Sequence, residues 1–187
     1  VGELMGYPRC CVAAFLSLAD RSNDSEIVYA VARRGCTHPH PLLNLGVGYL
    51  VPFYPCRFDC PEAVDFAEKV LEGLFPGEQG AEMRQAIYEE MASPTVYFDK
   101  QRALIFDGAL EESRIRFDSV RYISRTRHSD QESLLMRRAL EPFFDESRKA
   151  HIGEQNWELY TPREKFSLSQ RHRGAGILLP FGISDST

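Results

Sequence analysis

Two short stretches of this 187-residue chain place cysteines beside a proline where a helix begins. The first is GYPRCC, residues 6–11, and the second is YPCRFDCP, residues 54–61. Proline is favoured in the first turn of a helix, where its missing N–H is not needed. Both stretches lead into apolar residues at helical spacing, so each pair of thiols is predicted at a helix N-terminus. Any fold of this chain must accommodate two such helix starts.

The first half of the chain is predicted to be helical. One helix begins at Pro8 and ends before the RSND sequence, and a second runs from Glu26 to Arg34 with Gly35 as its stop. A third begins at Pro61 with Asp59 or Cys60 as its cap. Its predicted inward face comprises Cys60, Val64, Ala67, Leu71 and Leu74.

Two further segments complete this half. A fourth helix is predicted from Gly80 to Ala92, ended by Pro94. Residues 36–56 contain four prolines and two glycines, which argues against a long helix there. We therefore expect an ordered, apolar loop between the second and third helices, and long loops of this kind are often functional.

The second half changes to strand-like alternation. Residues 95–108 predict a hairpin turning near Lys100, and residues 113–124 predict a third strand. Residues 130–150 return to a helical pattern that Pro142 kinks, and three closing strands are predicted at residues 157–161, 165–169 and 176–181.

The chain is therefore expected to be α+β, with a helical, cysteine-bearing first half packed against a mainly antiparallel β second half. A length of 187 residues fits a single domain over residues 1–187. The change of pattern near residue 93 suggests subdomains at 1–93 and 94–187.

Composition limits the partners and the compartment. A net charge of −5 argues against a general nucleic-acid binder, and no apolar run approaches the length of a membrane span. The first residues lack the pattern of a signal peptide, and the five cysteines are an odd number. These features favour a cytoplasmic protein with reduced thiols.

The thiols leave three interpretations open. Cys10, Cys11, Cys56 and Cys60 could ligate a metal, either zinc or an iron–sulfur cluster. They could instead be catalytic, because a helix N-terminus stabilises a thiolate and lowers the pKa of a cysteine. The third interpretation is core packing, since cysteine is a small and often buried hydrophobe. Under each of them, we expect the two cysteine stretches to converge in space.

His40 and Asn44 are the candidate partners of a catalytic thiol. Both lie in the HPHPLLN segment, and they could orient or deprotonate a cysteine in a Cys–His–Asn arrangement. The alternative is that both fix a proline-rich loop through hydrogen bonds to the backbone. Cys36 stands apart from the two stretches and is expected to be structural.

Three motifs, GYPRCC, HPLLN (residues 40–44) and PCRFDC (residues 55–60), carry a resemblance to known proteins. The chain resembles the domain of unknown function that precedes the pyridoxal-phosphate-dependent thiocysteine lyase domain in leinamycin-type polyketide synthases. It is also similar to prokaryotic proteins with the pattern GYPxCC…HPxxN…PCxxxC. The resemblance covers roughly the first 75 residues.

This resemblance implies a role in sulfur incorporation. Such a domain would bind an α,β-unsaturated acyl chain held on an acyl carrier protein, and would assist C–S bond formation with a cysteine-derived thiol or persulfide. Its partners would be that carrier protein and the neighbouring lyase domain of the same polypeptide. Residues 42–53 could line the acyl tunnel, while the lack of a suitably placed lysine argues against pyridoxal phosphate in this chain. The alternative is a non-catalytic, metal-binding docking module, so whether the chain is an enzyme stays open.

Overall fold

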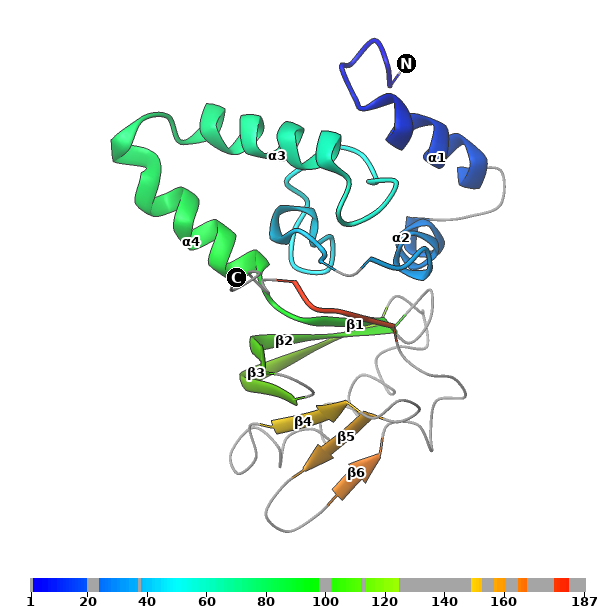
Figure 1. Cartoon of the computed structure of the whole chain (residues 1–187), viewed down its shortest axis with the longest axis vertical. Helices are drawn as coiled ribbons and strands as arrows, with labels where there is room; N and C mark the ends of the chain where they lie inside the picture. The colour runs from blue at the N-terminus through cyan, green and yellow to red at the C-terminus, as the bar shows by residue number, and fades with distance from the viewer. Residues whose placement is uncertain are drawn as a thin grey trace. The chain divides into compact units, whose positions relative to one another are not determined.

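The computed structural model describes residues 2–19, 24–36, 38–97, 102–111, 114–124, 149–152, 157–160, 165–167 and 177–181. These residues form four α-helices and seven strands, which is the predicted α+β class (Figure 1). They fall into two compact units: Val1–Ser93 with Leu179–Thr187, and Pro94–Leu178. Whether these units are subdomains of one domain, as the sequence suggests, stays a prediction.

The first unit contains the helices and all five cysteines. The helices are α1 (Arg9–Ala19), α2 (Asp24–Arg33), α3 (Pro61–Leu74) and α4 (Ala81–Met91). All four were predicted, and their ends follow local rules. The carbonyl of Pro8 accepts the N–H of Val12 at 3.0 Å, so α1 begins one residue after the proline. Cys60 is the N-cap of α3, with Pro61 at its first position. Gly35 follows α2 with a φ of +71°, a conformation that glycine adopts without strain.

The buried stripe of α3 differs partly from the predicted one. Cys60, Ala67 and Leu71 are buried as expected, and Ala63 is buried in addition. Leu74 was predicted to face inward, but it is 61% exposed. It is the last residue of the helix, so the stripe ends one turn earlier than the apolar pattern does.

Residues 38–56 form an ordered loop at the centre of this unit, as predicted. It contains one 3₁₀ turn, η1 (Pro41–Leu43), and otherwise has no regular structure. Its side chains are core residues nonetheless, because Leu42, Leu43, Leu45 and Val51 are each at most 3% exposed. The turn η1 contacts both α3 and α4, so the loop supplies the apolar surface on which these helices pack.

The side chain of Asn44 connects this loop to the end of α4 through hydrogen bonds. Its side chain is fully buried, and its Nδ2 donates hydrogen bonds to the carbonyls of Met91 and Ser93, each at 2.9 Å. Its Oδ1 accepts the N–H of Gly46 at 3.2 Å. A buried amide with its donors and acceptor engaged stabilises the fold and avoids the cost of unpaired polar groups.

The strands form one sheet in the order β6-β5-β4-β3-β2-β1-β7. Their bounds are β1 (Thr95–Tyr97), β2 (Arg102–Glu111), β3 (Arg114–Ser124), β4 (Lys149–Ile152), β5 (Trp157–Tyr160), β6 (Lys165–Ser167) and β7 (Ile177–Leu179). Neighbouring strands from β1 to β6 pair antiparallel, which is the predicted arrangement.

The long β2–β3 pair holds the core of the sheet unit. Leu104, Phe106, Ile115 and Phe117 are at most 2% exposed, and the rings of Phe106 and Phe117 meet edge to face at 5.2 Å. The register shifts between Asp107 and Gly108, which marks a β-bulge. Such a pair buries apolar area and adds the favourable electrostatics of an edge-to-face contact.

The helix predicted for residues 130–150 is wrong at its end. Lys149 and Ala150 begin β4, where they pair with Tyr160 and Leu159 of β5. The rest of that predicted helix, with Pro142, lies outside the described residues, as does the hairpin turn at Lys100. Within the part of the chain that the structure describes, every helix is too short or too polar to span a membrane.

We predict that Asn44→Ala destabilises the protein by about 2–3 kcal/mol, because it removes the buried hydrogen bonds that the side chain donates to the carbonyls of Met91 and Ser93. Urea denaturation followed by circular dichroism measures this change. Gln85→Ala on the exposed side of α4 is the control and should change the free energy of unfolding by less than about 0.5 kcal/mol. Equal effects of the two substitutions would show that the Asn44 hydrogen bonds contribute little.

A four-cysteine candidate metal centre

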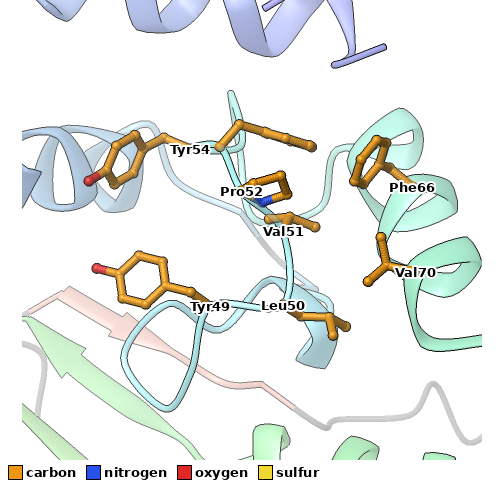
Figure 2. Close-up of a pocket in the computed structure, with 8 residues that line it drawn as sticks. Tyr49, Leu50, Val51, Pro52, Tyr54, Phe66 and Val70 are labelled. Carbon is orange, nitrogen blue, oxygen red and sulfur yellow. The ribbon is translucent and has the colours of Figure 1, made fainter. Parts of the chain in front are cut away.

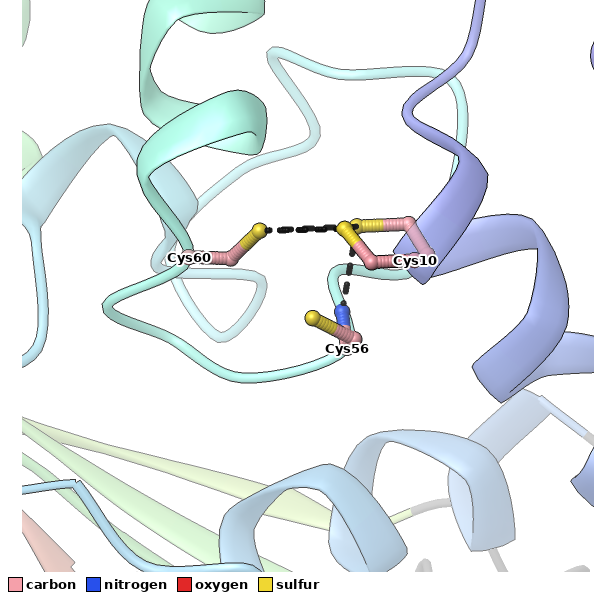
Figure 3. A group of neighbouring side chains, drawn as sticks. Cys10, Cys56 and Cys60 are labelled. Atoms are coloured by element: carbon pink, nitrogen blue, oxygen red, sulfur yellow. Dashed lines mark hydrogen bonds between the residues drawn. The ribbon is translucent and has the colours of Figure 1, made fainter.

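Four cysteine sulfurs from two distant parts of the chain meet in one place. The Sγ atoms of Cys10, Cys11, Cys56 and Cys60 all lie within 4.8 Å of one another (Figure 3). The predicted convergence of the two cysteine stretches is therefore confirmed. These four residues could hold a metal ion.

Local structure explains how each sulfur reaches the centre. Cys10 and Cys11 lie in the first turn of α1, and Cys60 caps α3. Cys56 lies four residues earlier, in a bend that the N–H of Cys60 closes by donating to the carbonyl of Arg57 at 3.2 Å. Arg34 donates to the carbonyl of Cys56 at 3.0 Å and anchors this bend. Two helix starts and one bend thus converge on the same point.

The spacing of the sulfurs matches the coordination sphere of a single ion. Cys10 lies 3.6 Å from Cys60 and 3.8 Å from Cys11, and Cys11 lies 3.9 Å from Cys60. In a tetrahedral zinc–thiolate site the sulfurs are about 3.8 Å apart, because each Zn–S bond is about 2.3 Å. The separations found here need little adjustment to enclose such an ion.

The four cysteines differ in exposure and in hydrogen bonding. Cys11 and Cys60 are 1% and 4% exposed, Cys56 is half-buried, and Cys10 is exposed. The backbone N–H of Cys56 donates to the sulfur of Cys11 at 3.3 Å. The sulfur of Cys10 instead lies 3.5 Å from the carboxylate of Glu62 in the first turn of α3. The centre therefore has a buried side and an open side.

The predicted lowering of the thiol pKa values is wrong. Desolvation of the sulfur, with a further contribution from Cys60, raises the pKa of Cys10 to about 12. The pKa values of Cys11 and Cys56 are also raised, again chiefly by desolvation. Burial of the sulfurs outweighs the partial charge of two helix ends, and repulsion between neighbouring thiolates adds to its effect. Without a cation the thiols of Cys10, Cys11 and Cys56 stay protonated, and a divalent ion would displace those protons.

His40 lies against α4. Its backbone N–H donates to Phe58, and its ring meets the edge of Tyr88 with centroids 5.7 Å apart. Its Nδ1 is buried without a hydrogen-bond partner, and burial lowers the pKa of the imidazole. His40 is not a member of the four-cysteine group, and both amide hydrogens of Asn44 are bound to carbonyls near the end of α4. Their catalytic role stays a prediction.

Two other residues near the centre complete its description. Cys36 is half-buried and lies outside the four-cysteine group; burial raises the pKa of its thiol to about 11. Glu62 was not expected at the site. Its position two residues after Cys60, in the first turn of a helix whose cap is one of the four cysteines, is the signal that could have identified it.

An apolar pocket of about 500 Å³ lies in the same unit (Figure 2). It is lined by Tyr49, Leu50, Val51, Pro52, Phe53, Tyr54, Phe66 and Val70. Part of the predicted apolar segment, residues 42–53, thus lines a pocket, together with two residues of α3. Phe53 and Phe66 also contact Tyr7, with ring centroids 5.1 Å and 6.1 Å away, so an aromatic group links the pocket wall to the residues before α1.

Residues 1–75 match the model of a family described as "Protein of unknown function (DUF483)". The match ends one residue after α3 and contains all five cysteines. Its extent agrees with that of the resemblance noted in the sequence. No curated protein and no solved structure matches the chain.

We predict that the imidazole of His40 titrates below its ordinary pKa of 6.5, because burial disfavours the charged ring. The folded state then binds fewer protons than the unfolded state. The stability contributed by His40 is therefore complete above pH 6.5 and is lost as the pH falls through the lower folded pKa. NMR titration of the imidazole, assigned with His40→Gln, measures the midpoint. A midpoint at or above 6.5 contradicts the prediction.

Proposed function

We propose that this chain is a metal-binding module in which Cys10, Cys11, Cys56 and Cys60 hold one zinc ion as thiolates. The observation that carries the proposal is the meeting of four sulfurs within 4.8 Å. A site built only of thiolates suits zinc or iron rather than the hard cations magnesium and calcium.

The spacing of the sulfurs favours one ion over an iron–sulfur cluster. In a cluster each cysteine binds a different iron or shares one with a single partner, so the thiolates surround several metal atoms. The sulfurs of Cys10, Cys11 and Cys60 are 3.6–3.9 Å apart, and all four sulfurs lie within 4.8 Å of one another, which leaves room for one metal atom only. Zinc is the ion that such closed, four-cysteine sites bind most often in proteins.

The surroundings offset the charge of the centre. Four thiolates and one divalent cation carry a net charge of minus two. The N-termini of α1 and α3 place partial positive charge at the sulfurs, and the N–H of Cys56 donates directly to Cys11. The guanidinium of Arg34 binds the carbonyl of Cys56 and adds a full positive charge nearby.

The role proposed for the ion is to hold α1 in place. Among the described side chains of this helix, only Cys11 is buried, while Phe15 and Leu16 are 38% and 64% exposed. A helix of 11 residues with so little buried surface is not expected to be stable by itself. Ligation through Cys10 and Cys11 would join it to α3.

The first test of this proposal is the metal content. Protein purified under reducing conditions should hold about one zinc per chain, and cobalt substitution should give the intense visible absorption of a tetrahedral thiolate site. Cys60→Ser should lose stoichiometric zinc and unfold at a lower temperature. Hydrogen exchange of the α1 amides should accelerate on chelation, because the helix loses its attachment.

Cys36→Ser is the matched control, since Cys36 is also partly buried but stands outside the group of four. This variant should retain both the zinc and the melting temperature of the parent protein to within a few degrees. A brown protein containing iron and sulfide would contradict the zinc assignment. A metal-free protein with an unchanged melting temperature would contradict the metal site itself.

A second candidate function is supported by the apolar pocket. By its resemblance to the domain that precedes a thiocysteine lyase, the chain would bind a carrier-linked, unsaturated acyl chain and assist C–S bond formation. The acyl carrier protein and the lyase domain would be its partners. The pocket has the size and lining of a small-molecule site.

We predict that an α,β-unsaturated acyl thioester of N-acetylcysteamine binds this pocket, and that Val70→Trp abolishes binding by filling it. Leu74→Trp, one turn further along α3 and 61% exposed, is the control that should leave binding intact. Isothermal titration calorimetry measures both. Binding that is equal in the two variants, or absent from the parent protein, would reject the pocket as the acyl site.

A further inference from the structure

The four cysteines of the proposed metal site are not equivalent, and this difference points to a reaction. We propose that Cys10 is the reactive ligand of the centre: hydrogen peroxide attacks its sulfur first, Cys60 completes a disulfide with it, and the ion is released. This inference rests on the proposed function, because it concerns the same four thiolates. If it holds, the ion both stabilises the structure and is released when the site is oxidised.

Accessibility selects Cys10 as the point of attack. Cys11 and Cys60 are nearly inaccessible, with 1% and 4% of their surface exposed, and Cys56 is half-buried. Cys10 is the most exposed residue of the four, although its sulfur is partly covered by the other thiols. Peroxide must reach the sulfur along the axis of its own O–O bond, so a sulfur enclosed by protein reacts slowly. Oxidation of cysteine follows thiolate character and exposure in this way.

Electrostatics select the same residue. The carboxylate of Glu62 lies 3.5 Å from the sulfur of Cys10. In the metal-free protein the thiol can donate a hydrogen bond to it, but a metal-bound thiolate has no proton, so the two anions repel each other. The repulsion weakens the bond between the ion and the sulfur of Cys10, and it keeps electron density on that sulfur. Cys11 has the opposite environment, because the N–H of Cys56 donates to its sulfur and withdraws charge.

Geometry selects Cys60 as the second sulfur. Of the sulfurs of Cys60 and Cys11, that of Cys60 lies nearer to the sulfur of Cys10, at 3.6 Å. Cys11 is almost as close, at 3.8 Å, but a disulfide between adjacent residues strains the backbone. A bond from Cys10 to Cys60 would join the start of α1 directly to the N-cap of α3.

The reaction has two balanced steps. The thiolate of Cys10 attacks one oxygen of hydrogen peroxide, the O–O bond breaks, and a sulfenic acid and hydroxide form. The thiolate of Cys60 then attacks the oxidised sulfur, an S–S bond forms, the S–O bond breaks, and a second hydroxide leaves. Peroxide has taken two electrons from two sulfurs. The ion keeps two thiolate ligands, which do not hold it against a chelator.

The test uses the zinc-loaded protein, hydrogen peroxide and a chromogenic zinc chelator. We expect zinc to be released in parallel with disulfide formation, and peptide mapping by mass spectrometry to find Cys10 linked to Cys60. Reduction with dithiothreitol and added zinc should restore the starting protein. Circular dichroism before oxidation confirms that the parent protein and the two glutamine variants described below are folded.

Two charge-neutralising variants test the role of Glu62. Glu62→Gln keeps all four thiols and should release zinc about two- to fivefold more slowly, the scale of one partly exposed charge pair. Glu82→Gln makes the same change in the first turn of α4 and should react like the parent protein. Slower release in the first variant alone supports the repulsion argued above.

The outcomes separate this inference from the proposal on which it rests. A chain that holds no zinc before oxidation overturns both. A chain that holds one zinc but forms a disulfide without Cys10 overturns the order of attack and leaves the metal site standing. Equal rates of zinc release from Glu62→Gln and Glu82→Gln would overturn the electrostatic argument for attack at Cys10. The metal site would again be left standing.

Discussion

The attachment of α1 to its unit depends on few contacts, which include the ring of Phe15 stacked on that of Tyr54 with centroids 6.1 Å apart. Cys11 is the one buried side chain among those described in this helix, and its sulfur lies within 3.9 Å of Cys60 at the start of α3. The start of α3 and the bend that carries Cys56 lie beside this contact. The guanidinium of Arg34 binds the bend. The pKa values of the Cys10, Cys11 and Cys56 thiols are raised, so in the absence of a cation these thiols contribute only weak S–H interactions. An ion would turn this weak contact into four coordinate bonds.

Local chemistry made much of this fold predictable. Pro61 and Gly35 determine where α3 begins and where α2 ends, because their backbone preferences act within a few residues. The same signals predicted that both cysteine stretches lie at helix starts, and hence that they could converge. Alternation along residues 113–124 predicted β3, since a strand with one buried face repeats every second residue.

The features that were missed depend on residues far away in the sequence. Lys149 and Ala150 are strand residues because Tyr160 and Leu159 pair with them, and no helical pattern could reveal that partner. The raised pKa values of the thiols follow from burial by a segment about 45 residues away, whereas the helix-end argument considered each helix alone. The contact of Glu62 with Cys10 likewise exists only once α1 and α3 meet.

Phe58, between Cys56 and Cys60, packs edge to face against Phe181 with ring centroids 5.5 Å apart, and both are at most 2% exposed. The compact unit that contains the cysteines is thus discontinuous: residues 1–93 are completed by a segment that begins at Leu179, the last residue of β7. During synthesis the thiols emerge from the ribosome well before Phe181 does. The bend that carries Cys56 can pack against the ring of Phe181 only after that residue has been synthesised. A nascent chain therefore has an interval in which its four thiols are present in a unit that is not yet closed.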